Sequence, residues 1–339
     1  MKHLEMTRRY LLAGSFALLA ACAMAPTQTE PGVRIDAGKG SFTIPGGGRN
    51  AAQSIVVHYY RPANFTSRSP VLIVLPGAGR NGDAYRDAWV AAADEAGVLI
   101  ASPSYPESGY NAAGYQMGGL IDNLKMGKPQ PGSTASSAYF RDEDLKFDVN
   151  ARREDWLFAD FDRLFGILTR ATGSKQRQYD LFGHSAGGQL AARVAVLHPD
   201  SRAHRIVAAN AGLYTLPDPA RPLPLGLSGL DVSEASLRRA FATDLTVMLG
   251  ENDNDPNKGG QHIHTPLLDA QGRDRFSRGQ SFFAFSSEKA KASKAPFKWK
   301  LQTVPGVGHD FRGMSRAAAK LLYGVDVDNS ATAAGKTVE

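Results

Sequence analysis

The pentapeptide Gly183-His184-Ser185-Ala186-Gly187 has the spacing G-x-S-x-G and lies between a strand-like and a helix-like segment. The preceding residues 178–182 read QYDLF and predict a β-strand, and residues 187–198 predict a helix. In such a strand-to-helix turn, the serine Oγ is exposed above the end of the strand, and the flanking glycines remove Cβ atoms that would clash. The N-terminus of the helix favours negative charge that develops in a transition state. We therefore predict that Ser185 is a nucleophile, and an ordinary turn is the alternative.

Strands and helices alternate along the rest of the chain. Apolar and β-branched runs predict further strands at 54–60, 70–75, 98–102, 205–209, 245–249 and 297–304. Apolar residues at helical spacing predict helices at 82–97, 155–172 and 313–323. This alternation predicts an α/β fold, in which helices cover both faces of a mainly parallel sheet. Three connections are longer than ordinary loops and are candidate substrate-binding elements, at 103–154, 211–244 and 254–295.

His309 is the best-placed histidine to act as a general base for Ser185. It ends the loop PGVGH, which directly follows the last predicted strand, so its imidazole can approach the serine. A structural loop histidine is the alternative. The pair His262 and His264 lies in a long connection, but no cysteine and no carboxylate cluster at ligand spacing accompanies it. We therefore expect no metal site.

The carboxylate that orients the base is expected just past the strand at 245–249. The residues there read GENDND, and we predict Asp253 as the acid, with Asp255 and then Glu251 as alternatives. A carboxylate at this place can accept a hydrogen bond from the His309 Nδ1 and fix the reactive tautomer. The run can also be read as a polar turn or a calcium-binding cluster, but it lacks the spacing of an EF-hand loop.

Two backbone N–H groups are expected to stabilise the oxyanion. One belongs to Ala186, the residue after the nucleophile, and the other to Ala78, in the glycine-rich loop PGAGRN at 76–81. Removing one such donor typically costs about 3 kcal/mol. A plain glycine-rich turn is the alternative for this loop. The spacing of a phosphate-binding loop is absent, so nucleotide binding is not expected.

Residues 40–325 resemble the α/β-hydrolase superfamily. The likeness rests on the pentapeptide, the chain order Ser185, Asp253, His309 and the glycine-rich loop after a strand. Within the superfamily, the segments LPGAGRN, GHSAGGQ and GVGHDF look most like esterases of the polyhydroxyalkanoate depolymerase and feruloyl esterase kind. Many of those enzymes carry His-Gly in the oxyanion loop, whereas this chain has Pro76-Gly77, which leaves the identity of the second donor open.

The resemblance implies an α/β-hydrolase fold with long insertions over the active site. It also implies a serine esterase that forms an acyl-enzyme on a small-molecule or polymeric ester, with no metal or organic cofactor. Two alternatives remain, a lipid-anchored serine peptidase or amidase and a non-catalytic envelope lipoprotein on a hydrolase scaffold. Four aromatic residues in or beside the first long connection either line a substrate pocket or pack in the core: Tyr105, Tyr110, Tyr115 and Trp156.

The N-terminal residues 1–21 resemble an export signal. Thr7-Arg8-Arg9 precedes an apolar run that is shorter than the roughly 20 residues of a membrane-spanning helix. The paired arginines fit the twin-arginine route and an ordinary signal equally well. The sequence Leu19-Ala20-Ala21-Cys22 looks like a bacterial lipobox, so Cys22 is the expected lipid-attachment residue. The alternative is a secretory signal that is cleaved near Ala23 or Ala25.

These features predict a lipid-anchored protein of the bacterial cell envelope, facing the periplasm or the exterior. The expected organisation is a signal peptide at 1–21, a tether at 22–39, one catalytic domain at 40–325 and a flexible tail at 326–339. The formal net charge of +6 is spread along the chain without a Lys/Arg block, so we expect no nucleic-acid partner. The single cysteine excludes an internal disulfide framework. The sequence does not indicate the oligomeric state.

Overall fold

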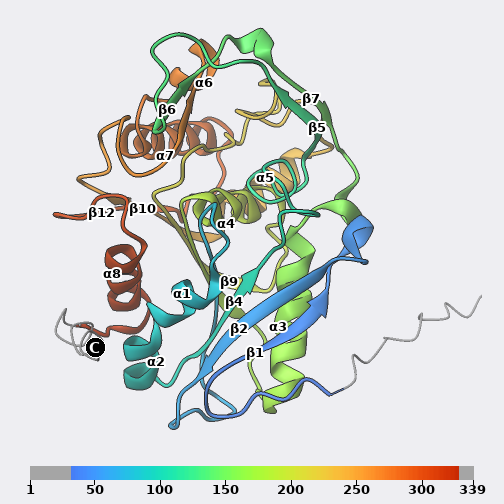
Figure 1. The fold of residues 1–339 in the computed structure, drawn as a ribbon, viewed down its shortest axis with the longest axis vertical. Coiled ribbons are helices and arrows are strands. Elements are labelled where there is room, and N and C mark those ends of the chain that lie inside the picture. The colour runs from blue at the N-terminus through green and yellow to red at the C-terminus, as the bar shows by residue number, and fades with distance from the viewer. Residues whose placement is uncertain (1–31, 328–339) are drawn as a thin grey trace, which may run out of the picture. The chain divides into compact units, whose positions relative to one another are not determined.

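The computed structural model describes residues 32–327. The predicted signal peptide, Cys22, most of the tether and the tail from residue 328 lie outside these residues. The described part contains a sheet of eight strands in the order β1-β2-β4-β3-β8-β9-β10-β12 (Figure 1). The strands are β1 (Gly38–Pro45), β2 (Ser54–Arg61), β3 (Val71–Leu75), β4 (Leu99–Ser104), β8 (Tyr179–His184), β9 (Ala203–Ala209), β10 (Asp244–Gly250) and β12 (Lys300–Val304).

The sheet is parallel from β4 to β12, whereas β2 pairs antiparallel with both β1 and β4. Every residue of β3 and β8 is buried, as expected for strands covered on both faces. One face packs on a core formed with α3 (Phe158–Thr172), α4 (Ala186–Leu197), α5 (Glu234–Phe241) and α7 (Arg275–Ala292). The other face packs on α1 (Gly82–Asp87), α2 (Val90–Ala96) and α8 (Phe311–Tyr323). The predicted α/β-hydrolase architecture is confirmed.

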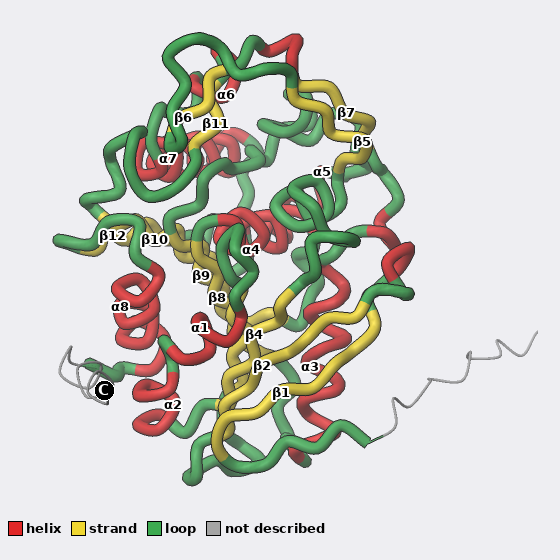
Figure 2. Tube along the Cα trace, viewed as in Figure 1, coloured by secondary structure: helices red, strands yellow, loops and turns green. Residues whose placement is uncertain are grey.

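The three long connections contain elements that the sequence did not predict. The first and third connections pair through β6 (Ser137–Tyr139) and β11 (His262–His264), and the first also forms a ribbon from β5 (Ile121–Met126) and β7 (Leu145–Val149). Figure 2 shows both small sheets apart from the main sheet. Helices complete the connections: α5, α6 (Pro266–Asp269), α7, and 3-10 turns at 142–144 and 153–155.

Other boundaries also differ from the predictions. The predicted helix at 82–97 is two helices, α1 and α2, separated at Ala88 and the fully buried Trp89. The last strand, β12, begins at Lys300 rather than at residue 297. At the N-terminal side Ile35 is buried in the core and β1 begins at Gly38, so ordered packing begins before the predicted domain boundary at residue 40. Within residues 32–327, no helix combines the length and apolar character needed to cross a membrane.

Candidate active site

Ser185 occupies the sharp turn between β8 and α4. Its backbone has φ 57° and ψ −117°, a conformation that costs energy for a residue with a Cβ and is typical of functional sites. The turn requires the two glycines of the pentapeptide, because a Cβ on Gly183 would lie 2.0 Å from the Gly187 carbonyl oxygen. A Cβ on Gly187 would lie 2.1 Å from the carbonyl oxygen of Leu75, on the neighbouring strand β3. Close backbone packing therefore holds the serine at the end of its strand.

His309 and Asp253 meet Ser185 at this edge of the sheet. The His309 Nε2 lies 3.0 Å from the Ser185 Oγ, and its Nδ1 lies 2.7 Å from the Asp253 Oδ2. His309 comes from the loop between β12 and α8, and Asp253 follows β10. Parallel strands end at the same edge of a sheet, which explains how residues so distant in sequence come together.

The structure distinguishes the three carboxylates considered for the acid. Asp255 accepts a hydrogen bond from the Asn257 backbone and pairs with Lys258 inside its own loop. Glu251 accepts a hydrogen bond from the Thr303 hydroxyl. Asp253 alone of the three contacts His309 and is buried.

Arg275, which the sequence analysis missed, completes the surroundings of the acid. Its Nη1 donates to the Asp253 Oδ1 and to the Lys258 carbonyl, each at 3.3 Å. Both charged side chains of this pair are almost fully buried, at 4% and 3% exposure. Arg275 is the first residue of α7, whose Phe276 N–H also donates to the Asp253 carbonyl. No local pattern signals this role, because the contact depends on where α7 packs.

The pKa of His309 is lowered from its ordinary value near 6.5, mainly because burial disfavours the imidazolium. The hydrogen bond that His309 donates to Asp253 opposes this shift, the Arg275 charge adds to it, and the charges of Asp253 and Asp310 raise the pKa. The imidazole is therefore neutral at pH 7 and has a free lone pair on the nitrogen that faces Ser185.

Comparison with known proteins identifies relatives among solved structures. No protein-family model and no curated protein sequence matched the chain. Among solved structures, poly(aspartic acid) hydrolase-1 from Sphingomonas sp. KT-1 is 36% identical over 85% of this chain and 100% of that chain, with a TM-score of 0.73. A poly(3-hydroxybutyrate) depolymerase from Bordetella parapertussis is 30% identical over 88% of this chain and 94% of that one, with a TM-score of 0.71.

The chain belongs to the α/β-hydrolase superfamily. A siderophore hydrolase from Aspergillus nidulans shares the fold alone, at 13% identity and a TM-score of 0.50 over 90% of this chain and 99% of that one. The relatives support a hydrolytic function for this α/β-hydrolase, and the first two are named for a polyamide and for a polyester.

The two predicted oxyanion donors of the hydrolase flank Ser185. Ala186 is the first residue of α4, and Ala78 is exposed in the loop after β3. The neighbouring Gly77 passes close to the nucleophile, since a Cβ there would lie 3.5 Å from the Ser185 Cβ. Across residues 32–327, neither Ala78 nor Ala186 has a hydrogen-bond partner for its backbone N–H. Both donors are thus available to a ligand.

His184, the residue before the nucleophile, contacts both Tyr85 and His309. Its Nδ1 lies 3.0 Å from the hydroxyl of Tyr85, and its ring lies 4.6 Å from the His309 ring between centroids. Burial lowers the pKa of His184 well below its usual range, so the ring is neutral and accepts the hydrogen bond from Tyr85. Tyr85 in turn stacks on Phe311, at 4.2 Å between ring centroids.

The four aromatic side chains considered for the substrate pocket pack in the core instead. Tyr105 and Tyr110 contact each other edge to face, at 4.8 Å between ring centroids. The Tyr115 hydroxyl donates to the Pro76 carbonyl at 2.7 Å and so anchors the oxyanion loop. The Trp156 indole donates to the Asn150 carbonyl. Of the two alternatives considered for these residues, core packing fits the structure, because all four belong to the buried core cluster.

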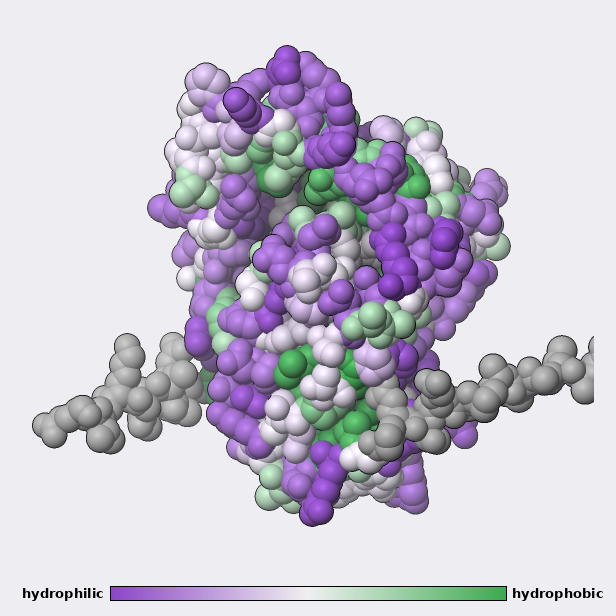
Figure 3. Space-filling model, turned by 45° about the vertical axis from the view of Figure 1, so that its right-hand side comes forward, coloured by the Kyte–Doolittle hydropathy of each residue, from purple (hydrophilic) through white to green (hydrophobic). Residues whose placement is uncertain are grey.

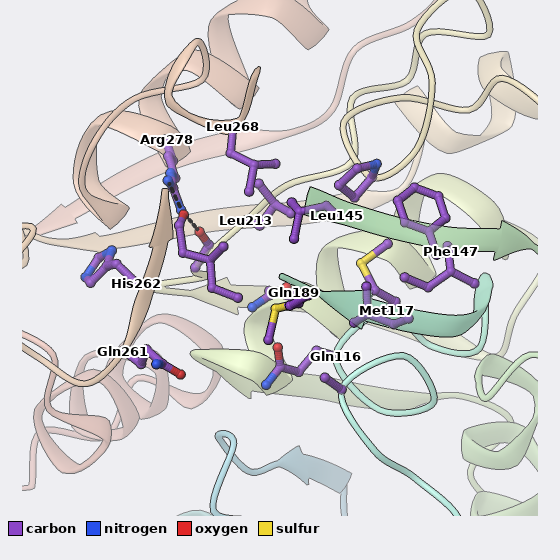
Figure 4. Close-up of a pocket in the computed structure, with 17 residues that line it drawn as sticks. Gln116, Met117, Leu145, Phe147, Gln189, Leu213, Gln261, His262, Leu268 and Arg278 are labelled. Atoms are coloured by element: carbon purple, nitrogen blue, oxygen red, sulfur yellow. Dashed lines mark hydrogen bonds between the residues drawn. The ribbon is translucent and has the colours of Figure 1, made fainter. Parts of the chain in front are cut away.

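A different set of residues lines a cavity of about 140 Å³ between α4, the β5–β7 ribbon and β11 (Figure 4). His262 belongs to this lining, and His264 instead bonds through its Nδ1 to Asp269 at 2.8 Å. Over the described part of the chain, no group of three or more His, Cys, Asp or Glu side chains has a geometry that could hold a metal ion.

Proposed function

We propose that this hydrolase cleaves carboxylic esters through a Ser185 acyl-enzyme. The observation that carries the proposal is the continuous chain of hydrogen bonds from the Ser185 Oγ through His309 to Asp253. His309 would take the hydroxyl proton as Ser185 attacks the ester carbonyl, and Asp253 would stabilise the resulting imidazolium. The N–H groups of Ala186 and Ala78 would hold the oxyanion.

The first half of the reaction ends when the tetrahedral intermediate collapses: the bond to the alcohol oxygen breaks, His309 gives its proton to the leaving alcohol, and the acyl-enzyme remains. Water then enters, loses a proton to His309 and attacks the acyl-enzyme, which releases the carboxylic acid and restores Ser185. All groups in these steps belong to the chain itself.

Amide hydrolysis is the second candidate. It is favoured by the 36% identity to a hydrolase whose name specifies poly(aspartic acid). An ester has a better leaving group than an amide, so the same site cleaves esters with less assistance to the departing atom.

The test compares matched esters and anilides of the same acids, from acetyl to dodecanoyl, with the purified full-length protein. We expect p-nitrophenyl esters to turn over and p-nitroanilides to remain intact, and an organophosphonate to label Ser185. Faster turnover of the anilides would replace the ester proposal by the amide one. A folded protein that neither turns over any substrate nor takes the label would support a non-catalytic scaffold.

Replacing Arg275 by methionine is expected to move the acidic limb of the pH profile of kcat/KM to higher pH. The Arg275 charge lowers the pKa of His309, so its loss lets the imidazole bind a proton at a higher pH and lose its function as a base there. In the wild type, we expect the limb to lie below the ordinary imidazole value of 6.5.

Arg278→Met is the matched control. Arg278 is also buried on α7 but contacts Asp269 and backbone carbonyls rather than Asp253. Both variants are expected to lower the melting temperature, and only Arg275→Met is expected to move the acidic limb. Equal movement of the limb in both variants would contradict the direct electrostatic role of Arg275.

A further inference from the structure

One end of the cavity of about 140 Å³ lies one turn of α4 from the nucleophile. Gln189, which contributes to its lining, lies one helical turn after Ser185, and its N–H donates to the Ser185 carbonyl. On the opposite side, Gln261 and His262 follow Gly259, whose Cα packs against His309, since a Cβ there would lie 2.4 Å from the His309 Cβ. Ser185 and His309 do not themselves line the cavity, which extends from these neighbouring residues toward the β5–β7 ribbon.

The ribbon supplies an apolar wall. Its strands alternate, so that Leu124, Met126, Leu145 and Phe147 line the cavity. The residues between them are polar and mostly exposed, including Lys125, Lys146 and Asp148. Figure 4 shows Leu145, Phe147 and Met117 together on the ribbon side of the cavity. Figure 3 shows apolar side chains gathered around a hollow in the surface. Cavities of about 150 Å³ with aliphatic linings stay dry and bind small apolar molecules.

No free charge faces this space. Arg278 is the one lining residue with a permanent charge, and its guanidinium donates to the carbonyls of Gly212, Gly272 and Ile263 and to Asp269, at 2.7 to 3.1 Å. Figure 4 shows two of these hydrogen bonds as dashed lines. Four of its five N–H groups are therefore occupied by the protein, and Asp269 compensates its charge.

The other polar groups of the lining are neutral. Burial lowers the pKa of His262 to about 3, so its ring carries no charge at pH 7. Gln116, Gln189 and Gln261 contribute amides, which hydrogen-bond to neutral oxygens without attracting a carboxylate strongly. A carboxylate that entered would lose hydration at a cost of several kcal/mol with no ion pair to offset it.

We propose that this cavity binds the acyl chain of the substrate and selects uncharged chains over chains that carry a carboxylate. This selectivity rests on the proposed esterase function. It distinguishes the chain from its relative named for poly(aspartic acid), a polymer with a carboxylate on every residue. The selection comes from an apolar wall and a sequestered arginine rather than from a repulsive acidic group.

The test pairs two p-nitrophenyl esters of equal chain length, the hexanoate and the adipate half-ester, which carries a terminal carboxylate. We expect wild-type kcat/KM to be at least 100-fold higher for the hexanoate. Met126→Lys places a cation on the exposed part of the cavity lining. This change should lower the ratio of kcat/KM for the hexanoate to kcat/KM for the adipate half-ester at least 10-fold. Val149→Lys is the matched control, because Val149 is similarly exposed on the same ribbon, at 43% against 47%, but does not line the cavity.

The p-nitrophenyl acetate rate separates failure of this inference from failure of the esterase proposal. The acetyl group is too short to fill the cavity, so wild type and Val149→Lys should hydrolyse it at similar rates. Equal turnover of the hexanoate and the adipate half-ester, or an equal response to the two lysine substitutions, would overturn the selectivity while leaving the esterase intact. Release of short fragments from polyaspartate by the wild type would also overturn it. Absence of acetate hydrolysis would instead reject the proposed function.

Discussion

Replacing Ser185 by alanine is expected to lower kcat for p-nitrophenyl esters by about 10⁵- to 10⁶-fold, the loss typical of a nucleophile in such a triad. The substitution removes only the Oγ that bonds to the His309 Nε2. Alanine meets the same backbone strain at φ 57° as serine does, so the melting temperature should change little. Initial rates and thermal unfolding of the two proteins, measured side by side, check both statements.

Ser286→Ala serves as the control for this substitution. Ser286 is a fully buried serine on α7 whose hydroxyl donates to the Phe282 carbonyl, remote from the catalytic hydrogen bonds. Its removal should leave kcat unchanged. If Ser185→Ala kept more than a hundredth of the wild-type rate, the nucleophile would have to be another group, and the acyl-enzyme mechanism on Ser185 would be rejected.

Replacing Asp253 by asparagine should lower kcat by about 10⁴-fold, because an amide favours the wrong tautomer of the histidine and does not stabilise the imidazolium. It should also destabilise the fold by about 3 kcal/mol, because Arg275 would be left as a buried charge without its carboxylate. Steady-state rates and urea unfolding measure the two effects separately.

Asp255→Asn is the matched control, two residues away in the same loop. Its carboxylate is 34% exposed and bonds only within that loop, so neither the rate nor the urea midpoint should change appreciably. A large loss of activity in Asp255→Asn with little loss in Asp253→Asn would reverse the assignment of the acid.

The sequence was most informative where function depends on local backbone geometry. The turn at Ser185 was predictable from the pentapeptide alone, because its two glycines are needed for the close packing at the turn. Asp253 and His309 were predictable from their positions just past predicted strands, since parallel strands bring such ends together. The parallel main sheet was predictable from the alternation of strands and helices along the chain.

The substrate cavity could not be predicted, because it depends on contacts between distant segments. β6 pairs with β11 across more than 120 residues, and residues from both of these connections line the cavity. Arg275 reaches Asp253 only when α7 packs beside β10. Helix α7 was not predicted, because its phenylalanines are spread over several faces and do not form one apolar face. Tyr105 and Trp156 were ambiguous because an aromatic residue in a long connection suits a core and a pocket equally well.

The position of β12 has a consequence for how activity is lost on heating. This strand lies at the outer edge of the sheet, pairs only with β10, and leads directly into the loop that carries His309. Edge elements open locally at lower free energy than central strands such as β3 and β8. If β12 detaches, His309 moves away from Ser185 while the turn that carries the serine stays folded. Activity should therefore be lost on heating at a lower temperature than that of global melting. The loss should be reversed by prompt cooling.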